Sequence, residues 1–250
     1  ICSKLIDVLK KIEKHGDIVG ENGILVIPSV SNMSMDFGKR FWISDDTDLN
    51  RLFPGNPSGE SGSRVAYAIM ETTKGYRYGI HLPSFYLGGT FMPHIRLLDP
   101  EHGSTSLANL FGLPYVIEAK SRPFDRTTLH NNWQRNGTEA FSLYTGMTGK
   151  IDDELAAQAV SSILRFLTRM GIIRYYSHSG YIASVLKEGD LEPIMTEAAG
   201  IFIKKAECGQ EVSRGDVLAQ IMKADSGEII SEVKAPTDGI IFYAETRPVV

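Results

Sequence analysis

The sequence predicts an α/β domain, built on a mostly parallel mixed sheet flanked by helices, followed by a small all-β domain. Three observations lead to this prediction. Helical and strand-like apolar patterns alternate over residues 1–175, Asp152–Met170 has the clearest helical periodicity, and short apolar runs separated by turns begin near Ser177. Alternating helices and strands favour a sheet covered on both faces, whereas regular short strands with frequent turns favour an all-β module. We therefore divide the chain into residues 1–175 and 180–250.

The first domain is expected to open with a helix and a buried strand. Apolar residues recur at helical spacing at the start of the chain, at Ile1, Leu5, Val8, Leu9 and Ile12. Ile24–Val30 is then a nearly continuous apolar run after a turn, which predicts a strand buried on both faces. Because the helix has no capping residue before it and Pro248–Val250 stops within a strand-like pattern, we expect a segment of a longer polypeptide.

The other elements of the first domain alternate along the chain. Further helices are predicted at Arg64–Thr73, Ser104–Gly112, Thr127–Asn136 and Asp152–Met170. Strands are predicted at Tyr78–Leu82, Tyr115–Ala119 and Ala140–Thr145. Gly171 is the expected stop of the last helix, because glycine readily adopts the left-handed conformation that ends helices.

Composition limits the classes of partner. Of the 250 residues, 42% are hydrophobic and 22% are charged, with a formal net charge of -4. Lysine and arginine are scattered, so nucleic acid and anionic membranes are disfavoured as partners, and no apolar stretch approaches the ~20 residues of a membrane helix. The two cysteines, Cys2 and Cys208, follow no metal or redox spacing, which favours a reducing cytoplasmic compartment, although a single disulfide stays open.

A loop around Asn50 and Arg51 carries the first candidate binding residues. Pro54 and Gly55 end any regular element just after this pair, and loops are where binding residues concentrate. The planar guanidinium of Arg51 matches a carboxylate two hydrogen bonds at a time, and Asn50 can add a neutral donor. The predicted ligand is a small carboxylate; the alternative is a solvated loop.

Histidines at strand ends are the next candidates. His81 ends a predicted strand, where ligands of open α/β sheets bind, so it could act as a metal ligand or a base. His94 and Arg96 lie one strand step apart on one face. The alternative for both histidines is a side chain hydrogen-bonded to a backbone carbonyl. His15 has the context of a solvated helix end. Surface positions are expected for the three remaining histidines, His102, His130 and His178.

The residues resemble a known family. Asp48–Gly55, the strand-end His81, Met92–Arg96 and Gly137–Leu143 look like the succinylglutamate desuccinylase/aspartoacylase branch of the zinc carboxypeptidase superfamily. The segment from Gly200 to Gly239 resembles the barrel-sandwich domain that many members carry. The resemblance implies a zinc carboxypeptidase-like fold and a zinc cofactor.

The resemblance also implies residue roles. His81 matches a zinc ligand that follows a central strand, while the family's His-Gly-x-x turn with two further ligands has no match in this chain. Asn50 and Arg51 match the pair that holds the substrate carboxylate, with His94 and Arg96 as further substrate-binding candidates. Arg40 is a looser match to an arginine that polarises the scissile carbonyl. Zinc and an arginine would together stabilise a tetrahedral oxyanion.

Tyr144 stands where the family carries its catalytic glutamate. A tyrosine hydroxyl ordinarily keeps its proton at neutral pH, so Tyr144 can donate a hydrogen bond but is a poor base. Glu139 and Glu118 are the nearest carboxylates in sequence, yet Glu139 is an odd number of strand steps from Tyr144 and should face the other way. Gly79 also stands where many members carry an acid.

The predicted function is a zinc-dependent amidohydrolase or deacylase that cleaves an amide bond of a small N-acyl amino acid or related carboxylate. One alternative is a degenerate member that binds such a ligand without hydrolysis. Another is a carrier modified at Lys223, although Asp225–Glu228 lengthens the following turn and should place Lys223 on a strand flank. A homo-oligomer is compatible with the sequence, which does not fix the oligomeric state.

Overall fold

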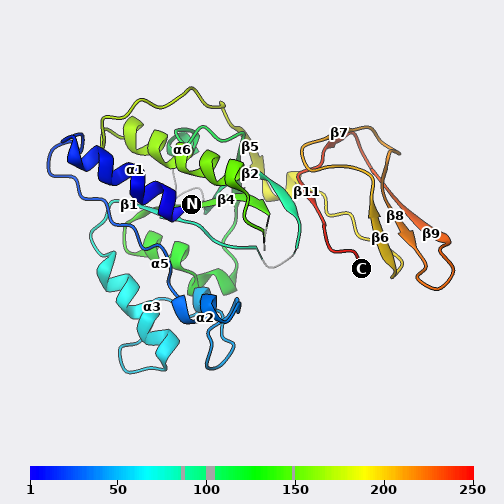
Figure 1. Ribbon diagram of the computed structural model, residues 1–250, viewed down its shortest axis with the longest axis horizontal. Helices are drawn as coiled ribbons and strands as arrows, with labels where there is room; N and C mark the ends of the chain where they lie inside the picture. Colours follow the sequence, from blue (N-terminus) through cyan, green and yellow to red (C-terminus); the bar gives the residue numbers. More distant parts are fainter. Residues whose placement is uncertain (86–87, 100–104, 148–149) are drawn as a thin grey trace.

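The computed structural model describes residues 1–85, 88–99, 105–147 and 150–250. Its main sheet contains six strands, and Figure 1 shows it in the larger of two lobes. The strands lie in the order β1 (Tyr78–His81), β4 (Glu139–Met147), β2 (Thr90–Leu98), β3 (Tyr115–Ala119) and β5 (Ser184–Lys187), and β11 (Tyr243–Ala244) pairs with β2. Pairs β1/β4, β2/β3 and β3/β5 are parallel, whereas β4 and β11 run antiparallel to β2, so the predicted mixed, mostly parallel sheet is confirmed.

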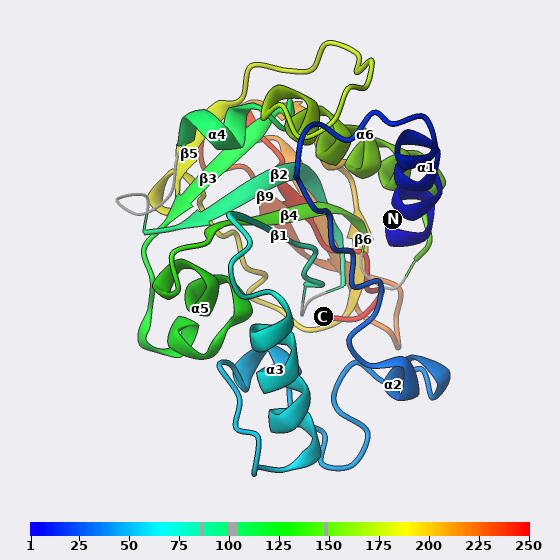
Figure 2. The same ribbon diagram turned by 90° about the vertical axis from the view of Figure 1, so that its left-hand side faces the viewer.

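Helices cover both faces of this sheet. Figure 2 shows α1 (Cys2–Lys14) and α6 (Asp153–Arg169) on one side, and α3 (Ser61–Thr72) and α5 (Leu129–Arg135) on the other. The shorter helices are α2 (Asn32–Asp36), α4 (Thr105–Asn109) and the 3-10 helices η1 (Leu49–Arg51), η2 (Pro123–Thr127) and η3 (Glu188–Asp190).

The α6 side of the sheet holds the larger hydrophobic core. Phe111, Phe141 and Phe166 are almost completely buried there, with Phe111 stacked on Phe166 at 4.3 Å between ring centroids. The carboxylate of Asp152 accepts hydrogen bonds from the first free N–H groups of α6, and Gly171 ends the helix at φ 69°. The local sequence signals were therefore sufficient to predict this helix.

A smaller core lies on the α5 side. Trp133 of α5 packs with Ala140 of β4 and with residues of α3. A Cβ on Gly79 of β1 would lie 2.5 Å from the Trp133 ring, so the strand at this position has room only for glycine. The helix therefore packs directly against β1 at Gly79.

The predicted strand at Ile24–Val30 is wrong. This segment is extended but pairs with no strand among the described residues, and Leu25 and Val30 are exposed by 41% and 46%. Ile24 and Val26 pack on the larger core and Ile27 on the smaller one. The apolar run therefore reflects contacts with two cores, because side-chain burial does not require a strand partner.

The C-terminal β strands form two small antiparallel sheets in the second lobe (Figure 1). One sheet contains β6 (Ile201–Lys204), β8 (Val217–Met222) and β9 (Ile229–Lys234), and the other β7 (Glu211–Val212) and β10 (Gly239–Ile240). Two strands beyond residue 180, β5 and β11, belong instead to the main sheet. The expected sequence division at 175–180 thus does not coincide with the division between the sheets. No helix in the described ranges is long and apolar enough to cross a membrane.

Candidate functional site

Three polar side chains stand side by side on neighbouring strands of the main sheet. Ser142 of β4 pairs with His81 of β1 on one side and with Arg96 of β2 on the other. Directly opposed residues project to the same face of a sheet, so the three side chains share one face. It is the α5 face, because Gly79, two residues before His81, lies against Trp133. We call His81, Ser142 and Arg96 the polar row.

His130 of α5 covers this row, and its expected surface position is wrong. The residue is only 3% exposed, and its Nδ1 lies 2.8 Å from the Ser142 hydroxyl oxygen. Within the described part of the chain its Nε2 is buried without a hydrogen-bond partner. Burial, together with the nearby charges of His81 and Arg96, lowers the pKa of His130 to about 3. The sequence signal was Thr128, whose side chain caps this short helix by accepting the Asn131 N–H.

The loop of Asn50 and Arg51 forms η1, and both side chains are engaged with the segment around α5. The amide oxygen of Asn50 accepts the Leu129 N–H at 3.0 Å, which satisfies a free donor at the start of α5. Arg51 donates to the Phe124 carbonyl at 3.1 Å and its guanidinium lies 5.0 Å from the centre of the Phe124 ring. Asn50 therefore has a structural role that sequence reasoning did not anticipate.

Asp48 connects this loop electrostatically to the polar row. It caps η1 by accepting the Asn50 N–H at 3.0 Å, and its other oxygen lies 4.0 Å from Arg51 Nε. Burial lowers the pKa of His81 to about 4, and the Asp48 carboxylate opposes that shift. The Asp48 carboxylate thus acts electrostatically on both Arg51 and His81, which belong to distant segments of the chain.

Arg40 holds the loop that follows β1. Its guanidinium donates to the Ser84 hydroxyl and carbonyl, each at 3.2 Å, and to the Phe85 carbonyl at 2.9 Å. Because this loop begins immediately after His81, Arg40 fixes the chain on the carboxyl side of that histidine. The guanidinium is exposed and keeps contact with water.

Tyr144 lies in an aromatic cluster at the same face of the sheet. Its ring stacks on His94 of β2, with centroids 5.0 Å apart and planes 7° apart, and meets Phe85 and Phe91 edge-on. His94 is 6% exposed and its Nδ1 lies 2.8 Å from the Met92 carbonyl oxygen. Burial lowers the pKa of His94 to about 4, with Arg96 lowering it and the Met92 carbonyl raising it. The backbone-bonded alternative for His94 is therefore the one seen.

The two carboxylates considered as replacements for the missing glutamate lie on the opposite face. Glu139 pairs with Tyr78, whose ring contacts Phe166 in the larger core. Glu118 accepts the Thr105 hydroxyl at 2.6 Å, beside α4. Glu188 of η3 is instead a carboxylate beside Arg96 of the polar row.

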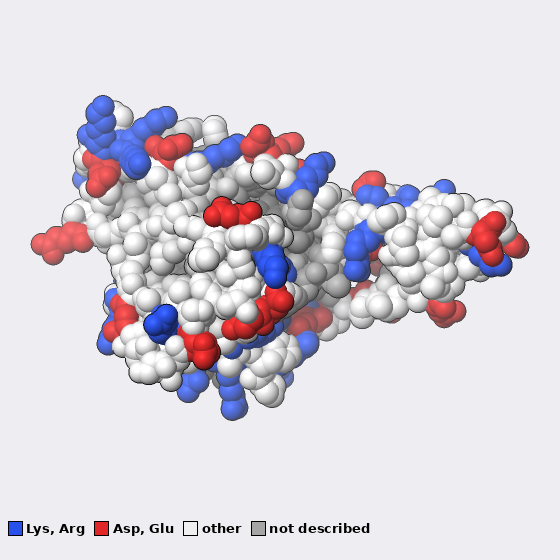
Figure 3. Space-filling model, turned by 60° about the horizontal axis from the view of Figure 1, so that its bottom comes forward, with Lys and Arg blue, Asp and Glu red and all other residues white. Residues whose placement is uncertain are grey.

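Glu188 connects the second half of the chain to the polar row. Its Oε1 lies 3.5 Å from a guanidinium nitrogen of Arg96 and 2.8 Å from one of Arg122. Lysine and arginine are interspersed with aspartate and glutamate over the face shown in Figure 3. The Glu188 carboxylate thus balances part of the positive charge of Arg96.

The remaining candidates lie away from the polar row. His15 is exposed at the end of α1, with Nδ1 2.7 Å from the Lys11 carbonyl oxygen, and His178 is exposed; both match expectation, while His102 lies outside the described residues. Lys223 closes the base of the β8–β9 loop through a backbone bond with Glu228, as expected. Cys2 and Cys208 are free thiols.

The chain has a mixed α/β fold with the polar row on one face of its helix-covered main sheet, and known structures share this fold. Neither a comparison with protein-family models nor one with curated protein sequences gives a match. The solved structures that match belong to the succinylglutamate desuccinylase/aspartoacylase family, so the resemblance seen in the sequence extends to the fold.

Three of these structures are particularly similar. The product-bound ectoine utilization protein EutE (DoeB) from Ruegeria pomeroyi has a TM-score of 0.77 and 19% identity over 90% of this chain and 71% of its own. A succinylglutamate desuccinylase from Silicibacter sp. TM1040 has a TM-score of 0.77 and 19% identity, covering 90% and 70%. The succinylglutamate desuccinylase/aspartoacylase from Rhodobacter sphaeroides has a TM-score of 0.73 and 20% identity, covering 90% and 70%.

Proposed function

We propose that this protein is a deacylase-type amidohydrolase that acts on a small N-acyl amino acid or a related carboxylate. One observation carries the proposal: the Asp48 carboxylate lies 4.0 Å from Arg51 Nε and also acts electrostatically on the strand-end imidazole of His81. The fold shared with desuccinylase and aspartoacylase structures supports the same class of reaction.

The residues around this face have complementary roles in the proposal. Arg51 binds the substrate carboxylate by exchanging the Phe124 carbonyl for two carboxylate oxygens. Arg40, anchored on the loop after His81, faces the amide carbonyl and stabilises its negative charge. Tyr144 donates a hydrogen bond, and its stacking on His94 fixes the plane of its ring. Arg96 stands beside Ser142 with its charge partly balanced by Glu188.

In this proposal zinc is held by His81, the residue that the family resemblance assigns to it. The described residues contain no group of three or more His, Cys, Asp or Glu side chains placed to hold a metal ion. They do not by themselves fit a zinc centre, so no step of the reaction is assigned to zinc. A histidine kept neutral by burial is nevertheless the form that binds zinc, and His81 has this property.

A non-hydrolytic binding protein is the second candidate, and the surroundings of Tyr144 favour it. At the position of the missing glutamate the structure has an aromatic ring stacked on His94, and Glu139 and Glu118 lie across the sheet. In that case Arg51 would retain its carboxylate ligand while turnover would be absent.

Activity and metal content separate these candidates. Hydrolysis should be measured on a panel of N-acetyl and N-succinyl amino acids, with bound zinc determined by mass spectrometry. We expect Arg51→Ala to raise KM by about tenfold or more, because a charge-assisted hydrogen-bond pair is lost, and Arg169→Ala on α6 to leave KM unchanged. Zinc content that is unaffected by His81→Ala would refute the ligand assignment. Ligand binding without turnover across the panel would select the second candidate.

A further inference from the structure

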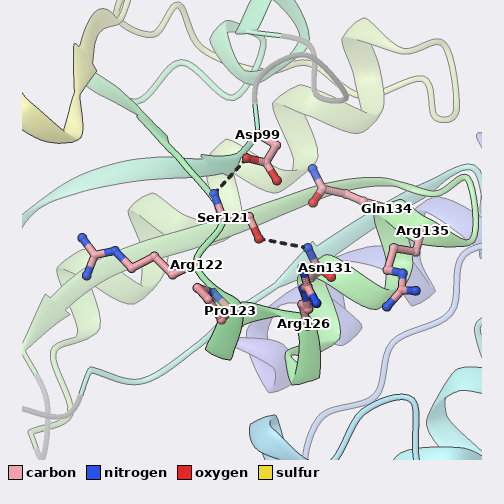
Figure 4. Close-up of a pocket in the computed structure, with 8 residues that line it drawn as sticks. All are labelled: Asp99, Ser121, Arg122, Pro123, Arg126, Asn131, Gln134 and Arg135. Atoms are coloured by element: carbon pink, nitrogen blue, oxygen red, sulfur yellow. Dashed lines mark hydrogen bonds between the residues drawn. The ribbon is translucent and has the colours of Figure 1, made fainter.

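A pocket of about 910 Å³ lies apart from the residues assigned above. It opens between α5, η2 and the carboxyl ends of β2 and β3, as Figure 4 shows. Its lining residues come from these elements and the loops that follow the two strands: Asp99, Ser121, Arg122, Pro123, Arg126, Asn131, Gln134 and Arg135. Phe124 separates it from the carboxylate-binding loop, with Arg51 5.0 Å and Arg122 5.9 Å from the centre of its ring.

The charge of this lining is strongly positive for a protein with a net charge of -4. The lining contains three arginines, Arg122, Arg126 and Arg135, and one carboxylate, Asp99. Arg122 is paired with Glu188, whereas no ion pair or hydrogen bond of the Arg126 or Arg135 side chain is found within the described ranges. A second pocket, of about 810 Å³, has no lysine or arginine in its lining and includes Asp152 and Glu154. Guanidinium groups thus gather in the first pocket and are missing from the lining of the second.

The rear wall of the pocket is polar and fixed by hydrogen bonds. The Asp99 carboxylate accepts the Ser121 N–H at 2.8 Å, and Gln134 donates to the Leu98 carbonyl at 2.7 Å. Asn131 is 8% exposed, and its amide oxygen is buried without a hydrogen-bond partner among the described residues. Its amide nitrogen donates a long hydrogen bond of 3.4 Å to the Ser121 hydroxyl oxygen. Figure 4 marks this bond with a dashed line.

We propose that this pocket binds a small polyanion, a molecule with phosphate or several carboxylate groups. Guanidinium groups bind both kinds of oxyanion through paired hydrogen bonds, and two exposed arginines suit a ligand with more than one negative charge. The volume lies within the range of small-molecule sites. This ligand is distinct from the substrate carboxylate at Arg51, so the pocket is an additional site.

Calorimetric titration of the full chain with pyrophosphate, citrate and uncharged glycerol tests the proposal. We expect pyrophosphate or citrate to bind and glycerol not to bind. Tighter binding of pyrophosphate would identify a phosphate ligand, and tighter binding of citrate a carboxylate ligand. The double substitution Arg126→Ala with Arg135→Ala should weaken the dissociation constant by about tenfold or more, since two charged contacts are lost.

Two further variants exclude trivial explanations. Arg169→Ala removes an exposed arginine from the last turn of α6, just as Arg135→Ala does in α5, and should leave binding unchanged. Arg126→Lys with Arg135→Lys keeps the charge and should weaken binding less than the alanine pair. Absence of binding by both anions, or equal weakening by Arg169→Ala, would overturn the proposal. Equal binding by the double alanine variant, with circular dichroism showing that it is folded, would do the same.

Discussion

Nδ1 of His130 lies 2.8 Å from the hydroxyl oxygen of Ser142, and this contact joins α5 to the centre of the main sheet. Both residues are buried, at 3% and 6% exposure. Ser142 also stands between His81 and Arg96 across the strands, so the contact sets how closely the helix approaches the polar row. The contact holds His130 over the three side chains of the polar row.

Ser142→Ala should therefore destabilise the protein. The His130 ring, whose Nε2 already has no partner among the described residues, would lose its one hydrogen bond inside the core. Leaving a buried polar group unsatisfied costs about 1–3 kcal/mol, measurable by urea unfolding. The matched control is Ser162→Ala, because the Ser162 hydroxyl donates to the Gln158 carbonyl within α6, and a change of under about 0.5 kcal/mol is expected there. Equal losses in both variants would contradict this prediction.

Gly79→Ala should also be destabilising. Its Cβ would lie 2.5 Å from Trp133, and Trp133 is held by its ring N–H donating to the Thr73 hydroxyl at 2.9 Å. Overpacking of this kind costs about 1–3 kcal/mol. Gly23→Ala is the control, because a Cβ there meets no atom within 4 Å. Thermal unfolding of both variants decides the prediction, and unchanged stability in Gly79→Ala would show that α5 can move away from β1.

Stability should fall as pH drops from about 6.5 to about 4. His94 is held neutral by burial with a folded pKa of about 4, below the ordinary value of 6.5. The unfolded chain therefore binds more protons across this window, so acid favours unfolding; the contribution is complete above 6.5 and is lost as pH falls through 4. His94→Phe should make the decline shallower by about 1–3 kcal/mol over the window, whereas the exposed His178→Phe should not. Urea unfolding at several pH values measures both slopes, and identical slopes in all three proteins would refute the assignment.

Asp152→Ala should cost about 1 kcal/mol of stability. The Asp152 carboxylate accepts the N–H groups of Glu154 and Leu155 at 3.0 Å each, and removing such a cap leaves these donors unsatisfied. Asp153→Ala is the neighbouring control. Asp153 forms an exposed ion pair with Lys4, and its loss should cost less, within the range of exposed pairs of about 0–1 kcal/mol. A larger loss in Asp153→Ala than in Asp152→Ala would contradict the assignment of the cap.

The elements with strong local signals could be predicted from the sequence. Asp152 and Gly171 mark both ends of α6, and the predicted strands at Tyr78, Tyr115 and Ala140 all appear in the main sheet. Period-two alternation also placed Glu139 on the opposite face from Tyr144 and His94 on the same face as Arg96. These features depend on neighbouring residues alone, which is why local patterns were enough.

Contacts between distant segments were decided by the tertiary structure. His130 is buried because α5 packs against β4, and nothing near it in the sequence specifies Ser142 as its partner. Ile24–Val30 is apolar because it lies against two cores, a pattern that a buried strand would produce equally well. The sequence by itself thus determined the α/β class and the candidates Arg51 and His81. Their common neighbour Asp48, the burial of His130 and the arginine pocket follow only from packing, since each depends on residues far apart in the chain.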